Sequence, residues 1–426
     1  MHRTLYSVAF YFALPVILLR LLLRSLRSPA YRRRIGERFA LQSPDIATGT
    51  ASLTLWVHAV SVGETVAAAP LIKALQHRYP QAQILVTTMT PTGSDRVRSL
   101  FGESVAHCYI PYDLPGSCKR FLRKYQPDAL ILMETELWPN LIWACHRHSV
   151  KLILANARLS EKSAAGYARF AGFSRELLSR IDVVAAQAAP DAERFVELGM
   201  DREKTRVTGS LKFIIEQKEQ LSQPYFAALK ESGRPIVIAA STRDGEEEKV
   251  LTAFRQCLAA VPDALLLLVP RHPERFDRVA RLSESRGLIT VRRSAATAVD
   301  ASSQVIIGDS MGEMLDYYSA ATVAFVGGSL VDTGCQNVLE PAALGIPIVV
   351  GPSQYNFATI CSQLERADAL RTVQDEAELA QAVIALLADE GARRTMGDAG
   401  LNLVRENQDS LPKLLGLIES LVQTDA

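Results

Sequence analysis

The stretch TVAFVGGSLVDTGCQNVLEPAALGIPIVVGP, residues 322–352, decides the fold of this chain. It opens with a β-branched, apolar run that favours a buried strand, and Gly327 and Gly328 end that strand. Asn337 suits the N-cap of a helix, and Gly345 suits its C-terminus, where a positive φ is favoured. A second short apolar run follows. The stretch therefore predicts a strand–turn–helix–strand unit.

Such a unit offers a binding point beyond the carboxyl end of its first strand. We expect the backbone N–H groups of the double-glycine turn and of the helix N-terminus to converge there without partners, which favours an anion. Glu340 would lie about one turn into the helix, where its carboxylate reaches a neutral polyol such as a ribose. An ordinary β–α–β crossover, in which the glycines only make the turn, fits the same residues.

Length and composition indicate a folded protein of two domains. The chain has 426 residues, which is too long for one compact core, and 48% of them are hydrophobic. A net charge of +1 gives no sign of nucleic-acid binding. The cysteines show no CxxC spacing, which predicts buried, reduced thiols in a cytosolic compartment rather than a zinc site or disulfides.

Residues 1–27 are predicted to form an N-terminal membrane anchor with a basic collar. Leu5–Leu23 is almost wholly apolar, and no small-residue cleavage site follows it, which argues against a removed signal peptide. The arginines after this run place the rest of the chain in the cytoplasm and suit anionic lipid head groups. The run is short for a span, so it could instead lie in the membrane interface or form a buried helix of a soluble protein. The arginines are Arg20, Arg24, Arg27, Arg32, Arg33, Arg34 and Arg38.

From about Leu53 onward, short apolar runs alternate with amphipathic stretches in two successive sets. This alternation predicts two Rossmann-like α/β domains, each with a doubly wound parallel sheet. We assign residues 28–218 to the first domain and residues 219–426 to the second, with the polar segment Glu216–Ser232 as a linker. Ligands bind such sheets outside the carboxyl ends of the strands, so the expected site is a cleft between the domains.

The loop from His58 to Thr65, at the end of the first predicted strand, carries a candidate general base. Gly63 allows a tight approach, and Glu64 would stand at a helix start, facing the cleft. A carboxylate there can accept the proton of a hydroxyl group. Ser61 and Glu64 also match a capping box, in which Glu64 only bonds its own helix end. Spacing alone favours the capping box.

Two further loops of the first domain bring charged side chains to strand ends. Glu134 and Glu136 follow an apolar strand, where carboxylates would be costly to bury without partners. We expect them to bind polyol hydroxyls or to pair with cations, for which Asn156–Arg158 offers a candidate; Glu136 also suits a helix cap. Lys212 would point into the cleft if its segment borders it, although a solvated surface lysine is the commoner outcome.

The second domain closes consecutive strands with loops suited to a nucleotide. Arg271 suits bidentate phosphate binding, and His272 adds a hydrogen-bond donor. Gly312 is expected to open a helix whose N–H groups face a phosphate or a base edge. With the small-residue turn Ala240–Gly245 and the opening stretch, these loops predict a site for a nucleotide-activated sugar. No GxGxxG with an acidic partner appears, which disfavours a dinucleotide, and a P-loop motif is missing.

A series of long motifs, in order along the chain, resembles those of the 3-deoxy-D-manno-octulosonic acid (Kdo) transferases of the lipopolysaccharide pathway. The resemblance spans essentially the whole chain, and no motif position departs from the pattern. The motifs are HAVSVGET, ETELWPN, NARLS, TGSLKF, VPRHPERF, GDSMGEM and FVGGSLVDTGCQNVLEPAALGIPIVVGP.

The resemblance implies a GT-B fold, in which two Rossmann-like domains face a cleft, and an inverting, metal-independent glycosyl transfer without a cofactor. It implies CMP-Kdo as the donor and the lipid A precursor lipid IVA as the acceptor, at the cytoplasmic face of the cell inner membrane. The family's proposed base falls on Glu64, which raises this role above the capping role. Glu134 and Lys212 match transition-state stabilisers. The implied CMP contacts are Arg271, His272, Gly312, Glu313, Met314, Asn337, Val338, Leu339 and Glu340.

Three other functions fit parts of the same pattern. One is a GT-B transferase that uses a UDP- or ADP-sugar, and another is a non-catalytic nucleotide-sugar sensor. The third is an isomerase of the nucleotide-sugar 2-epimerase kind, which shares the fold but is soluble, so the membrane segment argues against it. The sequence leaves open how many Kdo residues are transferred, because one-step and multi-step enzymes of the family share these motifs.

Overall fold

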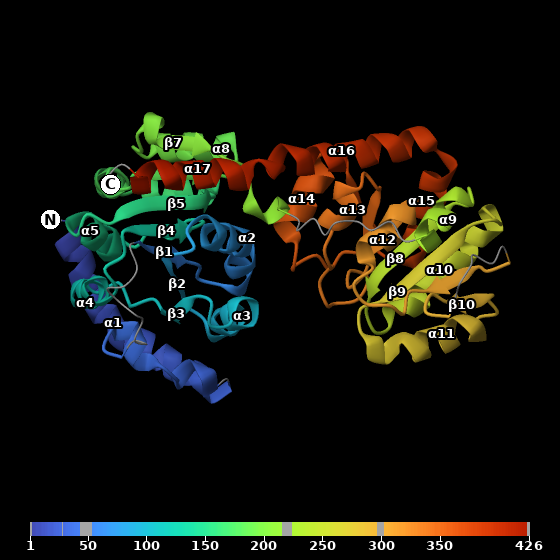
Figure 1. Cartoon of the computed structure of the whole chain (residues 1–426), viewed down its shortest axis with the longest axis horizontal. Coiled ribbons are helices and arrows are strands. Elements are labelled where there is room, and N and C mark those ends of the chain that lie inside the picture. Colours follow the sequence, from blue (N-terminus) through green and yellow to red (C-terminus); the bar gives the residue numbers. More distant parts are fainter. Residues whose placement is uncertain (1, 28, 43–52, 215–223, 296–301, 424–426) are drawn as a thin grey trace. The chain divides into compact units, whose positions relative to one another are not determined.

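The structure is a computed structural model that describes residues 2–27, 29–42, 53–214, 224–295 and 302–423. Its contacts divide the chain into two compact units, each with a central sheet surrounded by helices (Figure 1). The first unit holds residues 1–214 and 407–426, and the second holds residues 215–406.

The first unit is built on a 7-stranded sheet in the order β3-β2-β1-β4-β5-β6-β7, and all neighbouring strands are parallel. Apart from the edge strand β7, the strands are mostly buried apolar runs, as expected where helices cover both faces of a parallel sheet. The strand order reverses between β1 and β4, which makes the crevice beyond their carboxyl ends the expected ligand position. The strands are β1 (Thr54–His58), β2 (Gln83–Thr88), β3 (Ala106–Tyr109), β4 (Ala129–Met133), β5 (Lys151–Ala157), β6 (Val183–Ala186) and β7 (Thr205–Val207).

Helices cover both faces of this sheet and form a hydrophobic core on each side. Trp56, Phe121 and Leu132 belong to one core, and Leu71 and Ile131 belong to the other. The helices are α1 (His2–Arg27), η1 (Pro29–Arg32), η2 (Ile35–Phe39), α2 (Val62–Arg78), α3 (Pro91–Phe101), α4 (Pro115–Tyr125), α5 (Pro139–Arg147), α6 (Glu161–Ala168), α7 (Ala171–Leu178), α8 (Ala189–Glu197), η3 (Arg202–Lys204), η4 (Leu211–Phe213) and α17 (Ser410–Val422).

The last helix, α17, belongs to the first unit, although the sequence prediction placed residues 219–426 together in the second domain. Figure 1 shows this red helix lying along the first sheet. Leu414 and Ile418 of α17 are almost fully buried in the core that contains Leu71. Burying each such side chain stabilises the fold by about 1.5–3 kcal/mol, so the apolar stripe of α17 accounts for its position.

The second unit repeats the architecture, with a 7-stranded parallel sheet in the order β10-β11-β9-β8-β12-β13-β14. Its strand order reverses between β8 and β12. The strands are β8 (Ile236–Thr242), β9 (Leu265–Pro270), β10 (Thr290–Arg292), β11 (Val305–Ile307), β12 (Val323–Val326), β13 (Ile348–Val350) and β14 (Leu370–Thr372). The helices are α9 (Pro224–Glu231), α10 (Glu246–Ala260), η5 (Pro273–Arg275), α11 (Phe276–Ser285), α12 (Met314–Ala320), α13 (Leu339–Ala343), α14 (Ala358–Arg366), α15 (Glu376–Ala388) and α16 (Glu390–Gln408).

The opening stretch forms the predicted strand–turn–helix–strand unit as β12, α13 and β13. Gly345 follows α13 with φ 68, as predicted for a helix C-terminus. The helix is shorter than expected, because it begins at Leu339 rather than at Asn337. Asn337 still fulfils part of a cap, since its Oδ1 accepts the Leu339 N–H at 3.0 Å.

Other elements differ from the sequence prediction where the apolar pattern is short. The edge strands β7, β10 and β14, of three residues each, were not predicted. Part of the predicted linker Glu216–Ser232 is the helix α9, because Phe226 and Leu229 are buried in the second unit; residues 215–223 of that linker lie outside the described residues. All cysteines are buried and free.

Candidate functional sites

Glu64 lies in the first turn of α2, just beyond the carboxyl end of β1. Its Oε2 accepts the Val60 N–H at 2.7 Å, and its Oε1 accepts the Ser61 hydroxyl at 2.9 Å. The Ser61 hydroxyl oxygen accepts the Glu64 N–H at 3.3 Å. A variant of the capping box is therefore formed, with Val60 supplying the backbone donor. Each carboxylate oxygen keeps a second lone pair, so the cap is compatible with accepting a proton.

The pKa of Glu64 is raised to about 7, mainly because the side chain is buried. The negative charges of Glu134 and Glu136 raise this pKa further, and the hydrogen bonds from Val60 and Ser61 oppose the shift. A carboxyl group with a pKa near neutrality suits proton transfer, because both of its protonation states are accessible at the working pH.

Lys212 and Glu134 form an ion pair, with Nζ and Oε1 2.7 Å apart. The two residues come from η4 and from the loop after β4, which lie far apart in the sequence. The Leu211 N–H donates to Asn156 Oδ1 at 3.0 Å and so fixes η4 against the end of β5. Lys212 is therefore a positioned side chain rather than a solvated one, and it supplies the cation that was expected from Asn156–Arg158.

Several residues at or beside strand carboxyl ends have strained backbones. Glu134 has φ 56 after β4, Asn156 has φ 52 near the end of β5, and Ser241 has φ 55 near the end of β8. None is glycine, so each conformation costs about 1–3 kcal/mol and must be held by the surrounding structure. Strain of this kind is found at functional sites, and these three positions lie at the crevice edges of the two sheets, although Gln126 and Ser149 also have positive φ at the opposite edge of the first sheet.

Glu136 has a different role from the predicted helix cap. Its Oε2 accepts the Trp138 indole N–H at 2.6 Å. The start of α5 is instead capped by the buried Asp113, which accepts the N–H groups of Asn140 at 3.0 Å and Leu141 at 2.7 Å. Burial raises the pKa of the Glu136 carboxyl, and the charge of Glu134 adds to the shift. Glu136 therefore places negative charge near Glu64 and does not cap the start of α5.

In the second unit, the double-glycine turn after β12 does not present unpaired N–H groups, which corrects the expectation from the opening stretch. The carboxylate of Glu246 accepts the N–H groups of Gly328 at 2.7 Å, Ser329 at 3.0 Å and Leu330 at 2.9 Å. It also accepts the Arg243 N–H at 3.0 Å. The glutamate is fully buried, so the protein supplies its own anion to this turn.

Close approach explains why glycine is needed at this turn. A Cβ on Gly327 would lie 2.7 Å from the Thr242 Cα and 2.8 Å from Glu246 Oε2. A Cβ on Gly328, whose φ is 79, would lie 2.4 Å from the Gly334 carbonyl oxygen. The glycines therefore bring the turn against the end of β8 and the start of α10.

Glu247, the next residue of α10, connects the loops that surround it. Its carboxylate accepts the Thr242 hydroxyl at 2.7 Å and pairs with Arg275 Nη2 at 2.7 Å. The Thr242 carbonyl accepts the Arg271 N–H at 3.1 Å, which links these contacts to the loop after β9. Sequence reasoning missed Glu246 and Glu247, because two acidic residues in a first helical turn are also what the helix dipole favours.

Arg271 and His272 lie in the loop after β9, as predicted. Arg271 is exposed and lowers the pKa of Glu340, whose carboxyl pKa is otherwise raised by burial. His272 Nε2 lies 2.6 Å from Arg243 Nη1, and because a guanidinium can only donate, the imidazole nitrogen accepts. The proton of His272 is therefore on Nδ1, which lies 3.9 Å from Glu274 Oε1.

Glu340, in α13, is held by Asn337, whose Nδ2 donates to Glu340 Oε1 at 3.1 Å. Val338 and Leu339 are buried, and the Leu339 N–H already donates to Asn337 Oδ1. The positive charge of Arg271 acts on the Glu340 carboxyl and lowers its pKa slightly, without an ion pair between the two side chains among the described residues.

In the loop from Gly312 to Met314, the backbone could contact a ligand, but the carboxylate of Glu313 already has partners. Gly312 has φ 85, and α12 begins at Met314 instead of at Gly312. The Glu313 carboxylate pairs with Arg293 at 3.3 Å and accepts the Ser310 hydroxyl. The side chain of Glu313 is therefore occupied within the unit.

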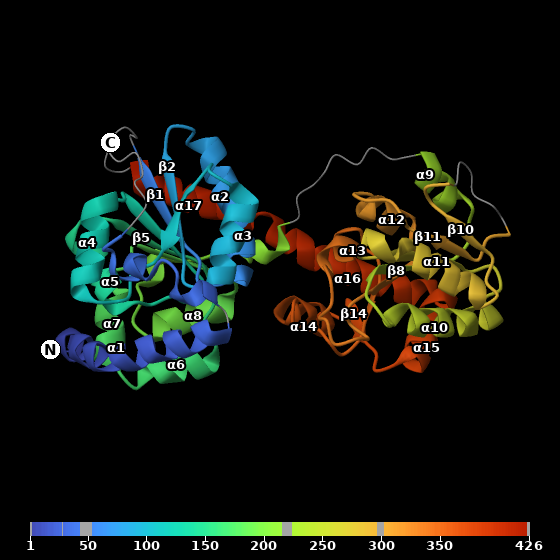
Figure 2. The ribbon, with the colours of Figure 1, turned by 90° about the horizontal axis from the view of Figure 1, so that it is seen from below.

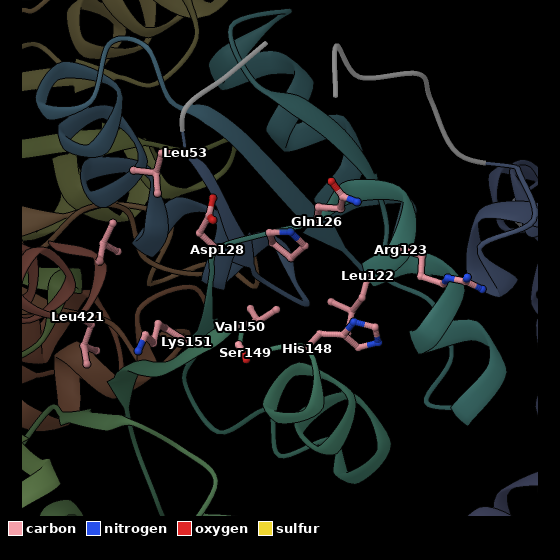
Figure 3. Close-up of a pocket in the computed structure, with 12 residues that line it drawn as sticks. Leu53, Leu122, Arg123, Gln126, Asp128, His148, Ser149, Val150, Lys151 and Leu421 are labelled. Carbon is pink, nitrogen blue, oxygen red and sulfur yellow. The ribbon is translucent and has the colours of Figure 1, made fainter. Parts of the chain in front are cut away.

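One cavity lies away from these residues. It measures about 640 Å³ and opens at the amino ends of the first sheet, where it is lined by Leu53, Asp128, His148, Lys151 and Leu421 among others (Figure 3). Leu53 borders a chain segment outside the described residues, so the cavity carries no ligand assignment. Within the described ranges, no group of three or more His, Cys, Asp or Glu residues is arranged to hold a metal ion.

Residues Arg3–Leu26 of α1 form the single helix, among the residues described, that is long and apolar enough to cross a membrane. Length and composition alone carry little weight, because signal sequences and buried core helices meet the same criterion. Only 6% of the most apolar window is buried, however, which excludes the alternative of a core helix.

Comparisons with known proteins agree with one another. The family model described as 3-deoxy-D-manno-octulosonic-acid transferase (kdotransferase) matches residues 33–215. The 3-deoxy-D-manno-octulosonic acid transferase of Haemophilus influenzae is 40% identical over 99% of this chain and 99% of its own length.

Two solved structures are also similar. The C-terminal CMP-Kdo binding domain of WaaA from Acinetobacter baumannii is 36% identical, covers 42% of this chain and 96% of its own, and has a TM-score of 0.41. MurG from Acinetobacter baumannii is 14% identical, covers 86% of this chain and 99% of its own, and has a TM-score of 0.51. The likeness to MurG concerns the fold alone, and with the two parallel sheets it confirms the predicted GT-B class.

Proposed function

This chain belongs to the family of 3-deoxy-D-manno-octulosonic acid transferases, and from that premise we propose how its residues transfer Kdo. Family membership makes the chain a glycosyltransferase of lipopolysaccharide synthesis. The proposal adds the donor CMP-Kdo, the acceptor lipid IVA, inversion at the anomeric carbon and independence from metal ions. It also adds attachment to the cytoplasmic face of the inner membrane.

Glu64 is the proposed general base. Its carboxylate takes the proton from an acceptor sugar hydroxyl while that oxygen attacks the anomeric carbon of Kdo from the face opposite CMP. The observation that carries this role is a buried carboxyl group with a pKa of about 7 at the point where the first sheet reverses its strand order. General base catalysis of this kind contributes about 10²–10⁴ in rate.

Glu134 and Lys212 are the proposed stabilisers of the transition state. Glycosyl transfer passes through an oxocarbenium-like state that carries developing positive charge. The Lys212–Glu134 pair at 2.7 Å places one fixed charge of each sign at the strand ends of the first unit. A preorganised pair can respond to developing charge without reorganising, which is why its geometry supports the role.

The second unit is proposed to bind the CMP part of the donor. Arg271 suits the single phosphate, and Glu340 suits the ribose hydroxyls, which both donate and accept hydrogen bonds. Because Glu246 occupies the N–H groups of the double-glycine turn, the phosphate is expected to rely on Arg271 and on the backbone of Gly312, Glu313 and Met314.

The decisive experiment is mass spectrometry of the product formed by the purified protein from CMP-Kdo and lipid IVA. The expected result is a mass gain of one or more Kdo residues, with the same rate when EDTA is present. Parallel reactions with UDP- and ADP-sugars test the other GT-B functions. Transfer from one of those donors, or loss of activity with EDTA, would contradict the proposal.

A further inference from the structure

Loop 134–138, which carries Glu134 and Glu136, runs from the end of β4 to the start of α5 and is held at both ends. At the β4 end, the Glu134 N–H donates to the Ala155 carbonyl at 2.9 Å. Glu134 itself has φ 56, a conformation that persists only where the surrounding structure holds it. Because Glu134 pairs with Lys212 and both glutamates raise the pKa of Glu64, the position of this loop sets the charges around the crevice.

A buried polar cluster fixes the other end of loop 134–138, where α5 begins. Asp113, which lies after β3, accepts the N–H groups of Asn140 at 3.0 Å and of Leu141 at 2.7 Å. In return, Asn140 Nδ2 donates to the Asp113 carbonyl at 2.8 Å. Asn140 is fully buried, and Asp113 is almost fully buried. Pro139 is the first residue of α5, and its ring fixes φ there, so Trp138 has little freedom to move independently of the cluster.

The amino-terminal end of α1 completes this cluster, although it lies far away in the sequence. Ser7 is buried and its hydroxyl donates to Asn140 Oδ1 at 2.9 Å, and Arg3 Nε donates to the same oxygen at 3.1 Å. Tyr6 hydrogen-bonds the Asp113 side chain. Figures 1 and 2 show this end of α1 beside the first unit, next to α5. The Asn140 amide therefore has both its oxygen and its nitrogen bonded to groups from outside α5.

Trp138 connects the cluster to the crevice. It directly precedes Pro139, and its Nε1 donates to Glu136 Oε2 at 2.6 Å. The ring of His58, the last residue of β1, packs edge-on against the Trp138 ring, with the ring centroids 5.8 Å apart. The chain continues from β1 into α2, where Glu64 lies. A shift at the start of α5 would therefore move Trp138 and Glu136 relative to Glu64.

We propose that the amino-terminal end of α1 positions loop 134–138 for glycosyl transfer by acting through Asn140 and Asp113. In this role α1 touches neither substrate nor reacting atoms, and it holds in place the groups that do. Removing one donor leaves a buried acceptor short of a partner, which is costly, so the cluster is expected to rearrange. A misplacement of about 1 Å at reacting groups can slow a reaction by about 10²-fold. The positioning role rests on the proposed functions of Glu64 and Glu134.

Ser7→Ala removes one hydroxyl from the cluster, and Ser25→Ala is the matched control. Ser25 is also a buried serine of α1, but its hydroxyl donates to the Leu22 carbonyl of the same helix, at 2.6 Å. The full-length proteins are assayed in detergent micelles with CMP-Kdo and lipid IVA. We expect Ser7→Ala to lower kcat by about 5- to 100-fold while KM for CMP-Kdo stays unchanged, because the donor binds to the second unit. Ser25→Ala should match the unmodified protein in both quantities.

Hydrogen exchange tests the same cluster without any sugar substrate. Mass spectrometry should show faster amide exchange over residues 134–141 in Ser7→Ala than in Ser25→Ala, because the N–H groups at the start of α5 lose a fixed acceptor. Equal exchange in the two variants, or equal kcat, would overturn the positioning role. An unmodified protein that transfers no Kdo would contradict the proposed function instead, and faster exchange in Ser7→Ala would then still support the link between α1 and loop 134–138.

Discussion

The two units share one architecture but arrange their charged residues in opposite ways. In the first unit, carboxylates gather beside the paired cation Lys212: burial and the charges of Glu134 and Glu136 raise the pKa of Glu64 to about 7. In the second unit, the carboxylates of Glu246 and Glu247 already have partners. Glu246 accepts backbone N–H groups, and Glu247 accepts a hydroxyl and pairs with Arg275. The first unit therefore holds groups poised to change protonation, and the second holds a fixed frame.

Because of this difference, we expect substitutions in the two units to have different effects. Loss of a charged group at the β1–β4 crevice is expected to slow the chemical step while donor binding persists. Loss of a group in the frame around β8 and β12 is expected to weaken donor binding or stability. The predictions below test this separation, beginning with the largest effect.

Substitution of Glu64 is expected to have the largest effect. Glu64→Ala should lower the transfer rate by about 10²–10⁴, because the proton acceptor is lost, while CMP affinity stays unchanged. Loss of the cap should cost about 0.5–2 kcal/mol of stability as well. Steady-state kinetics, CMP calorimetry and thermal melting measure the three quantities. A variant that melts early but retains its specific activity would show that Glu64 is only a cap.

Glu340→Gln should act on binding rather than on chemistry. The change keeps the size of the side chain but removes the charge that we propose accepts hydrogen bonds from the ribose. A hydrogen bond to a charged group is worth about 1.5–3 kcal/mol, or about 10- to 150-fold in affinity. Calorimetry should show that CMP and CMP-Kdo bind more weakly, with lipid IVA affinity unaltered. Unchanged CMP affinity with weakened acceptor binding would mean that the donor has been assigned to the wrong unit.

Glu246→Gln tests the frame directly. The amide would turn an N–H group towards backbone N–H donors, which should lower stability by about 1–3 kcal/mol and weaken CMP binding. Glu248→Gln is the matched control, since Glu248 is an exposed glutamate of the same helical turn and should change stability by less than about 0.5 kcal/mol. Equal melting temperatures of the two variants, with equal CMP affinity, would show that the turn does not depend on Glu246.

The pH dependence gives the most specific effect. With a pKa of about 7, Glu64 is mostly protonated below that pH and cannot accept a proton. The quantity kcat/KM should therefore fall about tenfold per pH unit well below pH 7 and level off above it. CMP affinity measured over the same range should not follow this curve. A kcat/KM that stays flat down to pH 5 would remove Glu64 from the proton transfer.

Local patterns predicted the elements, and long-range contacts account for what they missed. Apolar runs located the central strands, and Gly345 was predicted correctly because its role depends on its own backbone. The Lys212–Glu134 pair depends on η4 being fixed against the end of β5, the strand beside β4, so its members could be named from motifs but not joined. Glu246 was missed because its partners, Gly328 to Leu330, lie far along the chain.

The position of α17 bears on the order in which the protein matures on the ribosome. The first unit needs Leu414 and Ile418 to cover the core around Leu71, yet these residues are translated only after the whole second unit. At about 5–20 residues per second, the roughly 200 residues of the second unit take about 10–40 s to synthesise. Throughout that interval one apolar face of the nascent domain stays open to chaperones. Folding of the first unit is therefore completed only after the second unit has been translated.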